Sequence, residues 1–328
     1  MGRVSRSLAV AAPLLAGLAL WGWRSGDQAP IDVVAEARRS LGIPLESSLV
    51  ETNGIRLHVV QAGPADGPPV VLLHGFPEFW WTWHAQLAAL AQAGFRVIVP
   101  DLRGFGLSDK PPHVEDYRAE QRRADIVGLL DALGHERVYL AGHDFGGFVA
   151  WNLAIRNPER LRKLVVFNVA HPEVYLAPPP GEPEHETTNW FRTFFQLPWL
   201  PELVGRSGDW YLLSRNLVET SRPGTFADPA LRYYKWAWAH ENAIHTMIDW
   251  YRASFRYPVE TPAEPRVRMP ARIVWGALDA FNDPRHAEPS LAFCDDAKLV
   301  RFPDAGHWLL HEKPAETSQL LIEFFGER

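Results

Sequence analysis

A glycine-rich turn between an apolar strand and a helix constrains the fold of this chain more than any other sequence feature. In "LAGHDFGGFVAW" (140–151), Asp144 is the centre of a Gly-x-Asp-x-Gly motif that follows an apolar run. Small residues on both sides are needed where the backbone bends sharply from strand to helix and presents the central side chain. The motif therefore predicts a nucleophile elbow with Asp144 at its tip. On this motif alone, Asp144 could instead be an ordinary N-cap of the helix.

Strand-like and helix-like segments alternate on both sides of this turn. Alternating residues about Asn53-Gly54 predict a hairpin over 49–63. Apolar strands are expected at 69–75, 95–104, 137–144 and 162–169, with helices at 84–93, at 117–133 and from Phe145. This alternation predicts βαβ units and therefore an α/β fold with a mostly parallel sheet.

The alternation stops after His171 and resumes at Pro270, ending in a helix at about 314–326. The residues between, 172–264, contain aromatic clusters at helical spacing. We expect an α/β core formed by 49–171 and 265–328, interrupted by a helical cap at 172–264 over the ends of the strands. The aromatic residues could be ordinary core packing, and they also suit a cap that faces an apolar substrate.

The N-terminal segment is the candidate for membrane contact. Arg3 and Arg6 precede an uncharged run at 8–23, which is short for the roughly 20 residues that span a bilayer and long for a signal-peptide core of about 7–15. Residues 1–24 are therefore expected to be an uncleaved anchor, a cleaved export signal or a helix that does not insert. Residues 25–48 are expected to form a linker and a leading helix. The protein is accordingly expected to be membrane-anchored or exported.

Composition excludes several other classes of function. The net charge of −6 over 328 residues offers no basic surface for nucleic acid. The single cysteine, Cys294, cannot form an intrachain disulfide. Neither a metal-ligand cluster, a phosphate-binding loop nor a dinucleotide-binding glycine pattern is present in the sequence, so no cofactor is expected. The oligomeric state is left open.

Two later segments supply partners for Asp144. "WGALDAF" places Asp279 just past a strand, and "DAGHW" places His307 in a loop past the next one. Either residue alone could be an ordinary loop residue. The order nucleophile, acid, histidine is nevertheless the order expected after a nucleophile elbow of this kind. Together the three residues predict a catalytic triad.

The same pattern predicts an oxyanion hole formed by two backbone N–H groups. One is the N–H of Phe145, the residue after the nucleophile. The other belongs to Phe76 in "HGFP" (74–77), which follows an apolar strand, and Pro77 would hold the bend.

With these motifs in place, the chain resembles epoxide hydrolases of the α/β-hydrolase fold from about residue 45 to the C-terminus. The resemblance is carried by "HGFPEFW", "DLRGFGLSDKP", "GHDFGG", "WGALDAF" and "AGHWLLHEKP", and by the cap segments "NVAHPEVY", "FFQLPWLPE" and "IDWYRASF". It implies an eight-stranded sheet flanked by helices, with an inserted helical cap. The apolar N-terminus is similar to that of membrane-anchored members of the family.

The resemblance implies a two-step reaction that uses water and a small hydrophobic epoxide. Asp144 opens the epoxide and forms a covalent ester. His307, oriented by Asp279, then activates water that hydrolyses the ester. A serine would form an ether with a saturated carbon, and water cannot cleave that ether, whereas an ester can be hydrolysed. This requirement explains the carboxylate at position 144.

The family usually supplies two cap tyrosines that protonate the epoxide oxygen. Tyr251 matches the second, but Phe191 stands at the position of the first and has no hydroxyl. Tyr211, Tyr233 or Tyr234 could substitute, or Tyr251 could act alone; for each of these tyrosines, packing within the cap is the preferred interpretation. The predicted substrate contacts are His74, Pro77, Trp80, Phe191, Phe195, Tyr251 and Trp308.

Dehalogenases that share the aspartate nucleophile are the nearest alternative. Haloalkane dehalogenases typically hold the halide with a Trp after the nucleophile and an Asn or a second Trp, but Phe145 and Phe76 occupy the matching positions here. Fluoroacetate dehalogenases place arginines where this chain has Phe145 and Phe148. Many of them put the triad acid after the preceding strand, at the position of Asn168. A non-catalytic binding protein on a hydrolase scaffold is the second alternative.

Overall fold

Eight strands form one mixed sheet. The computed structural model describes residues 31–175, 180–181, 189–260 and 262–327. Along the sheet the strand order is β1-β2-β4-β3-β5-β6-β7-β8; β2 is antiparallel to β1 and β4, and every other neighbouring pair is parallel. The predicted mostly parallel sheet is confirmed. The strands are β1 (Glu46–Thr52), β2 (Ile55–Ala62), β3 (Pro69–Leu73), β4 (Arg96–Pro100), β5 (Val138–His143), β6 (Leu161–Phe167), β7 (Ala271–Gly276) and β8 (Ala297–Phe302).

The hairpin that opens the sheet turns at Asn53-Gly54, as predicted. Thr52 pairs with Ile55, so the turn has two central residues, with φ of 45° at Asn53 and 76° at Gly54. Two positive φ angles define the turn type whose twist matches that of antiparallel strands, and Asn-Gly is the dipeptide that adopts it most readily.

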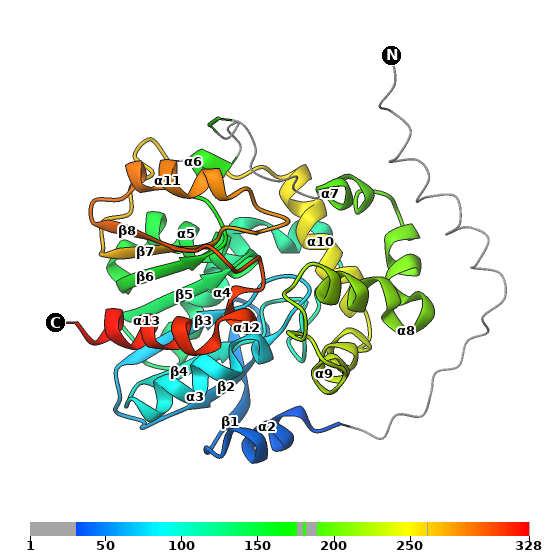
Figure 1. The fold of residues 1–328 in the computed structure, drawn as a ribbon, viewed down its shortest axis with the longest axis horizontal. Helices are drawn as coiled ribbons and strands as arrows, with labels where there is room; N and C mark the ends of the chain where they lie inside the picture. The colour runs from blue at the N-terminus through cyan, green and yellow to red at the C-terminus, as the bar shows by residue number, and fades with distance from the viewer. Residues whose placement is uncertain (1–30, 176–179, 182–188, 261, 328) are drawn as a thin grey trace.

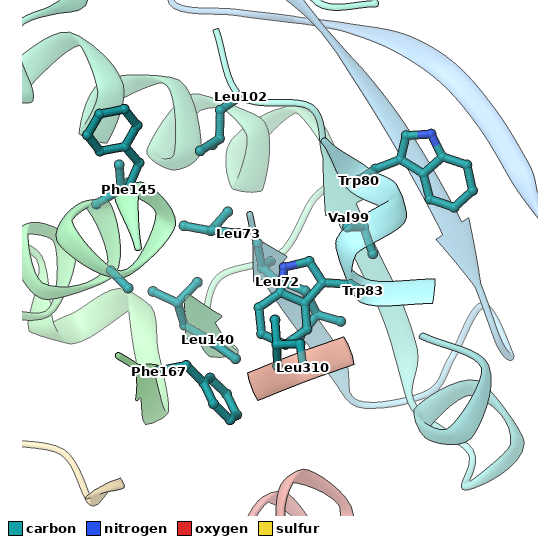
Figure 2. Close-up of a cluster of buried hydrophobic side chains, with 14 of the residues drawn as sticks. Leu72, Leu73, Trp80, Trp83, Val99, Leu102, Leu140, Phe145, Phe167 and Leu310 are labelled. Atoms are coloured by element: carbon teal, nitrogen blue, oxygen red, sulfur yellow. The ribbon is translucent and has the colours of Figure 1, made fainter. Parts of the chain in front are cut away.

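Helices cover both faces of the sheet (Figure 1). Among them α3 packs against α13, and α4 packs against α5. The central strands β3, β5 and β6 are therefore buried on both sides, which explains their nearly continuous apolar sequences. Figure 2 shows Leu73, Leu140, Phe167 and Trp83 in this core. The flanking helices are α2 (Val33–Leu41), α3 (His84–Gln92), α4 (Ala119–Ala132), α5 (Phe145–Arg156) and α13 (Pro314–Gly326).

The described parts of the segment between β6 and β7 are largely helical, and the helices from Trp190 onward lie to one side of the sheet (Figure 1). Its helices fall within the predicted 172–264, although the exact boundaries of the cap as a domain stay a prediction. The backbone leaves helical geometry at Ser207–Trp210 inside α8. The helices are α6 (Pro172–Tyr175), α7 (Trp190–Phe194), α8 (Leu200–Glu219), α9 (Asp228–Trp238) and α10 (Ala243–Arg256); the short α11 (Ala287–Ser290) and α12 (Leu309–Glu312) follow in the core.

The predicted anchor or signal, residues 1–24, lies outside the described residues. Helix α2 begins at Val33, within the range 25–48 expected to hold a linker and a leading helix. In the part of the chain that the structure describes, every helix is too short or too polar to cross a membrane.

Candidate active site

Asp144 occupies a strained turn between β5 and α5. Its φ of 49° and ψ of −117° are uncommon for a residue with a side chain. The neighbouring glycines are required by close backbone contacts: a Cβ on Gly142 would lie 2.3 Å from the Gly146 carbonyl oxygen, and one on Gly146 would lie 2.2 Å from that of Leu73. The Gly-x-Asp-x-Gly spacing is therefore explained by steric necessity. Strained backbone of this kind clusters at active sites.

The two carboxylate oxygens of Asp144 have different surroundings. Oδ1 accepts a hydrogen bond from the Phe76 N–H at 3.0 Å, whereas Oδ2 lies 3.9 Å from Nε2 of His307. The Asp144 side chain keeps 13% of its surface exposed, against 3% for His307, so it is the more accessible of the two. Of the two predicted oxyanion donors, Phe76 contacts the carboxylate; among the described residues no such bond comes from the Phe145 N–H.

The predicted acid and histidine meet beside this carboxylate. Nδ1 of His307 lies 3.0 Å from both carboxylate oxygens of Asp279. Oδ1 of Asp279 also accepts the N–H groups of Phe281 at 2.9 Å and Asn282 at 3.0 Å. These bonds hold the carboxylate in place, and the carboxylate in turn orients the imidazole with Nε2 toward Asp144.

Asn168 is a further part of this arrangement. It follows β6 with a φ of 56°, and its side-chain N–H₂ donates to Oδ2 of Asp279 at 2.8 Å. Its own carbonyl accepts from the Asn282 side chain at 2.8 Å. The sequence marked this position only as the alternative place for a triad acid. In the structure it carries an amide that holds the acid supplied from the next strand.

The charges at the triad shift the pKa values of both buried groups. Burial lowers the pKa of His307, but the carboxylates of Asp279 and Asp144 outweigh it and leave that pKa above its usual value. For Asp279, burial raises the pKa, but His307, the Asn282 N–H and the Asn168 amide lower it by more, so the pKa lies below its usual value. The geometry thus favours a basic imidazole beside an ionised acid.

A further buried carboxylate, that of Glu78, lies among histidines next to His307. Nε2 of His143 lies 2.8 Å from the carbonyl oxygen of His307. Beside it, Glu78 Oε1 lies 2.7 Å from His311 Nε2 and accepts from the Tyr234 hydroxyl at 3.0 Å. Burial raises the pKa of Glu78, yet His311 and His143 hold it well below its usual range. Glu78 lies in "HGFPEFW", but nothing in that motif singles it out as a buried charge.

An aromatic cluster borders Asp144 and His307. Tyr251 of α10 is central in it, with ring centroids 4.7 Å from Phe145, 5.1 Å from Phe76 and 5.7 Å from Phe191. Burial and the Asp144 carboxylate raise the pKa of Tyr251 well above its usual value, so its hydroxyl keeps its proton. We define the aromatic cluster as Phe76, Phe145, Phe191, Phe195, Tyr251 and Phe281.

The remaining predicted substrate contacts divide into two groups. Pro77 follows Phe76 and its carbonyl accepts the Trp238 indole N–H, while Trp308 packs on His307 with centroids 5.0 Å apart. The ring nitrogens of His74 are already engaged, one with the Gly75 carbonyl and the other with the Leu102 N–H, each at 3.0 Å.

Trp80 is remote from the site. Figure 2 shows its ring across the hydrophobic core from Phe145. Its backbone N–H donates to Asp101, and its side chain is fully buried. The position of Trp80 therefore does not favour its predicted substrate contact, whereas the predicted contact of His74 stays a prediction.

The three tyrosines considered as replacements for the first cap tyrosine, Tyr211, Tyr233 and Tyr234, are not members of the aromatic cluster. Tyr211 is 54% exposed on α8. The Tyr233 hydroxyl donates to Glu36, and that of Tyr234 to Glu78. Tyr251 is thus the one predicted tyrosine in the aromatic cluster. In the described part of the chain, no group of three or more His, Cys, Asp or Glu side chains is placed to hold a metal ion.

Comparison with known proteins adds a family and several relatives. Residues 68–314 match the family described as alpha/beta hydrolase fold. The chain is 41% identical over 281 residues to the AB hydrolase superfamily protein YfhM of Bacillus subtilis, covering 85% of this chain and 98% of the relative. It is 33% identical over 285 residues to epoxide hydrolase 4 of Homo sapiens, covering 85% and 78%. Epoxide hydrolase A from Mycobacterium thermoresistibile has a similar solved structure, with a TM-score of 0.74, 26% identity, and coverage of 86% and 98%.

Proposed function

Because this chain belongs to the alpha/beta hydrolase fold family, we propose that it opens epoxides to vicinal diols through a covalent ester on Asp144. The observation that carries the proposal is the split environment of that carboxylate: Phe76 N–H holds Oδ1, and Oδ2 faces His307. Relatives named epoxide hydrolases support the same reaction class. The chain is a hydrolase, and the covalent mechanism is what we add.

In the first half of the reaction, Oδ2 of Asp144 attacks a carbon of the epoxide. The carbon–oxygen bond breaks, and its electron pair stays on the oxygen, which needs a proton. Tyr251 is the proposed donor: its ring contacts Phe145 and Phe76, and burial and Asp144 raise its pKa, so that its hydroxyl keeps a proton to give. A positioned acid of this kind typically contributes about 10²–10⁴-fold to a rate.

In the second half, water hydrolyses the ester. Nε2 of His307 is not hydrogen-bonded to Asp144 at 3.9 Å and can accept a proton from a water that attacks the ester carbonyl. The oxyanion forms at Oδ1, which the Phe76 N–H already contacts, and the Phe145 N–H is the second proposed donor. The loss of one oxyanion donor typically costs about 10²–10³ in rate.

Dehalogenation by the same nucleophile is less well supported. A departing halide needs N–H donors, and the two indoles next to the site are committed elsewhere. Trp250 stacks on Phe145 but donates to the Arg103 carbonyl, and Trp308 donates to the Thr220 hydroxyl. The aromatic cluster favours a hydrophobic epoxide, of an aryl or a fatty-acid kind.

Trapping the ester tests this proposal. We expect His307→Gln treated with styrene oxide to gain the mass of one epoxide on the peptide that contains Asp144, because alkylation proceeds and hydrolysis does not. Asp144→Ala in the same background should gain nothing. Asp144→Ser should not restore turnover, since a serine ether is stable to water.

A substrate panel separates the alternatives. Terminal, trans-disubstituted and fatty-acid epoxides should be consumed by the wild-type enzyme, and haloalkanes should not. An adduct from haloalkanes alone would establish a dehalogenase. No adduct with either class, in a folded protein, would mean that Asp144 is not a nucleophile.

A further inference from the structure

A second tyrosine, Tyr175, lies near the candidate active site, and no sequence motif singles it out. Two consecutive residues of helix α7, Phe191 and Arg192, contact Tyr251 and Tyr175. Phe191 contacts Tyr251 with centroids 5.7 Å apart, and the Arg192 guanidinium lies over the ring of Tyr175 at 5.2 Å. Position 191, where the family usually has a tyrosine, is thus a phenylalanine, but the next residue, Arg192, packs against the ring of Tyr175.

Tyr175 and Tyr251 both pack against α5, the helix that begins directly after Asp144. The Tyr251 ring lies 4.7 Å from Phe145, and the Tyr175 ring lies 4.6 Å from Phe148. Residues three apart lie on one face of a helix, so the two tyrosines cover adjacent parts of the first turn of α5. That turn begins at Asp144, whose carbonyl accepts the Phe148 N–H at 3.0 Å.

The hydroxyl of Tyr175 is available for a ligand. Among the described residues, neither Tyr175 nor Tyr251 uses its hydroxyl in a hydrogen bond. Arg192 is fixed by a 3.2 Å hydrogen bond to the Asn282 side-chain oxygen, and the Asn282 N–H in turn bonds the triad acid. The ring of Tyr175 is thereby held between Phe148 and a guanidinium that is tied to the triad loop.

The electrostatics agree with this placement. Burial and the carboxylates of Asp144 and Asp279 raise the pKa of Tyr175 to about 12, while Arg192 lowers it. The pKa of Tyr251 responds to Asp144, Arg192 and Tyr175. The two hydroxyls therefore share one electrostatic environment with the nucleophile, and both remain protonated at neutral pH.

We propose that the Tyr175 hydroxyl is the second acid of the reaction and binds the epoxide oxygen together with Tyr251. It takes the role that a hydroxyl at position 191 would have had. The proposal rests on the proposed function of Asp144. As the carbon–oxygen bond breaks, the oxygen takes one proton from one tyrosine and a hydrogen bond from the other. The proton released when Asp144 regains its charge after ester hydrolysis passes to the tyrosinate and restores the neutral tyrosine.

The rate of alkylation tests this role directly. In the His307→Gln background the ester accumulates, so its formation from styrene oxide can be followed by rapid quench and mass spectrometry. Tyr175→Phe and Tyr251→Phe should each slow this step by about 10-fold or more, and the double variant should be slower than either, because each phenylalanine keeps the ring and loses only the proton donor. Tyr211→Phe, the same change at an exposed cap residue, should leave the rate as it was.

Hydrolysis of the ester separates an acid from a structural residue. With His307 intact, the ester that forms on Asp144 of the Tyr175→Phe variant should be hydrolysed at the wild-type rate, because that step needs no acid at the epoxide oxygen. Equal slowing of alkylation and hydrolysis would assign Tyr175 a structural role. Normal alkylation in Tyr175→Phe would overturn the proposal, although an adduct on Asp144 would still support the proposed function. Absence of any adduct in the parent variant would overturn both.

Discussion

At the scale of single residues, the charge on Asp144 and the basicity of His307 are coupled. The Asp144 carboxylate is one of the groups that raise the pKa of His307. In the reaction that we propose, Asp144 becomes a neutral ester, and that contribution would then disappear. The imidazole should then lose its proton more readily at the moment when a base is needed.

An NMR titration can measure this coupling. In the free enzyme the pKa of His307 should lie above the usual 6.5, and in Asp144→Asn it should fall, because the asparagine has the shape of the carboxylate without its charge. The signal missing from His307→Gln identifies the resonance. An unchanged pKa in Asp144→Asn would show that the two groups are not coupled.

At the scale of elements, a buried ion network joins the helices of the cap. Arg252 of α10 has a side chain that is 5% exposed and pairs with Glu202 of α8 at 2.7 Å and with Asp249 at 3.0 Å. Its remaining N–H groups donate to the carbonyls of Phe195 at 3.0 Å and Leu197 at 2.7 Å. Arg252 therefore positions the turn that carries Phe195 of the aromatic cluster.

Removing this arginine should destabilise the cap strongly. Arg252→Ala leaves Asp249, which is fully buried, with only His245 as an ion-pair partner among the described residues, and the loss of one partner of a buried pair typically costs about 3–5 kcal/mol. Urea denaturation should show a lower midpoint. Arg215→Ala, which breaks an exposed pair with Glu219 on α8, is the matched control and should stay close to wild type. Similar midpoints for both variants would contradict a structural role for the Arg252 network.

The elements themselves were largely predictable, because their signals are local. The final helix occupies 314–326, the hairpin turns at Asn53-Gly54, and α5 begins at Phe145. Alternation of apolar residues, turn dipeptides and flanking prolines act over a few residues of backbone. The break inside α8 at Ser207–Trp210, where Gly208, Asp209 and Trp210 have positive φ angles, was not predicted.

At the scale of the whole molecule, two histidines are buried in an uncharged state. Burial lowers the pKa of both His84 and His171 to about 4. His84 stacks on His311 with centroids 5.9 Å apart, and His171 stacks on Phe293 with centroids 4.6 Å apart. Each joins segments that are distant in the chain, so their protonation affects the stability of the assembled fold.

Acid should therefore destabilise the protein. In the unfolded chain these histidines take up protons below about pH 6.5, but in the folded protein they do so only near pH 4. Their stabilising contribution is complete above pH 6.5 and is lost as the pH falls toward 4, by up to about 3 kcal/mol for each group. Thermal denaturation at pH 7.5, 6 and 5 should show a falling midpoint. His171→Phe, which keeps the ring stacking, should make this dependence shallower, and an unchanged slope would contradict the prediction.

The sequence by itself determined the succession of strands and helices along the chain, the steric need for glycine around Asp144 and the candidate triad of Asp144, Asp279 and His307. These depend on short stretches of backbone and on an order along the chain, both of which are visible in the letters.

Only the tertiary structure decided which distant side chains meet. It brought Asn168 to Asp279, Arg192 to Tyr175 and Tyr175 to the first turn of α5, and it set Trp80 across the core from Phe145. Such contacts depend on the path of the whole backbone and on the packing of helices against the sheet, and no local pattern records that path.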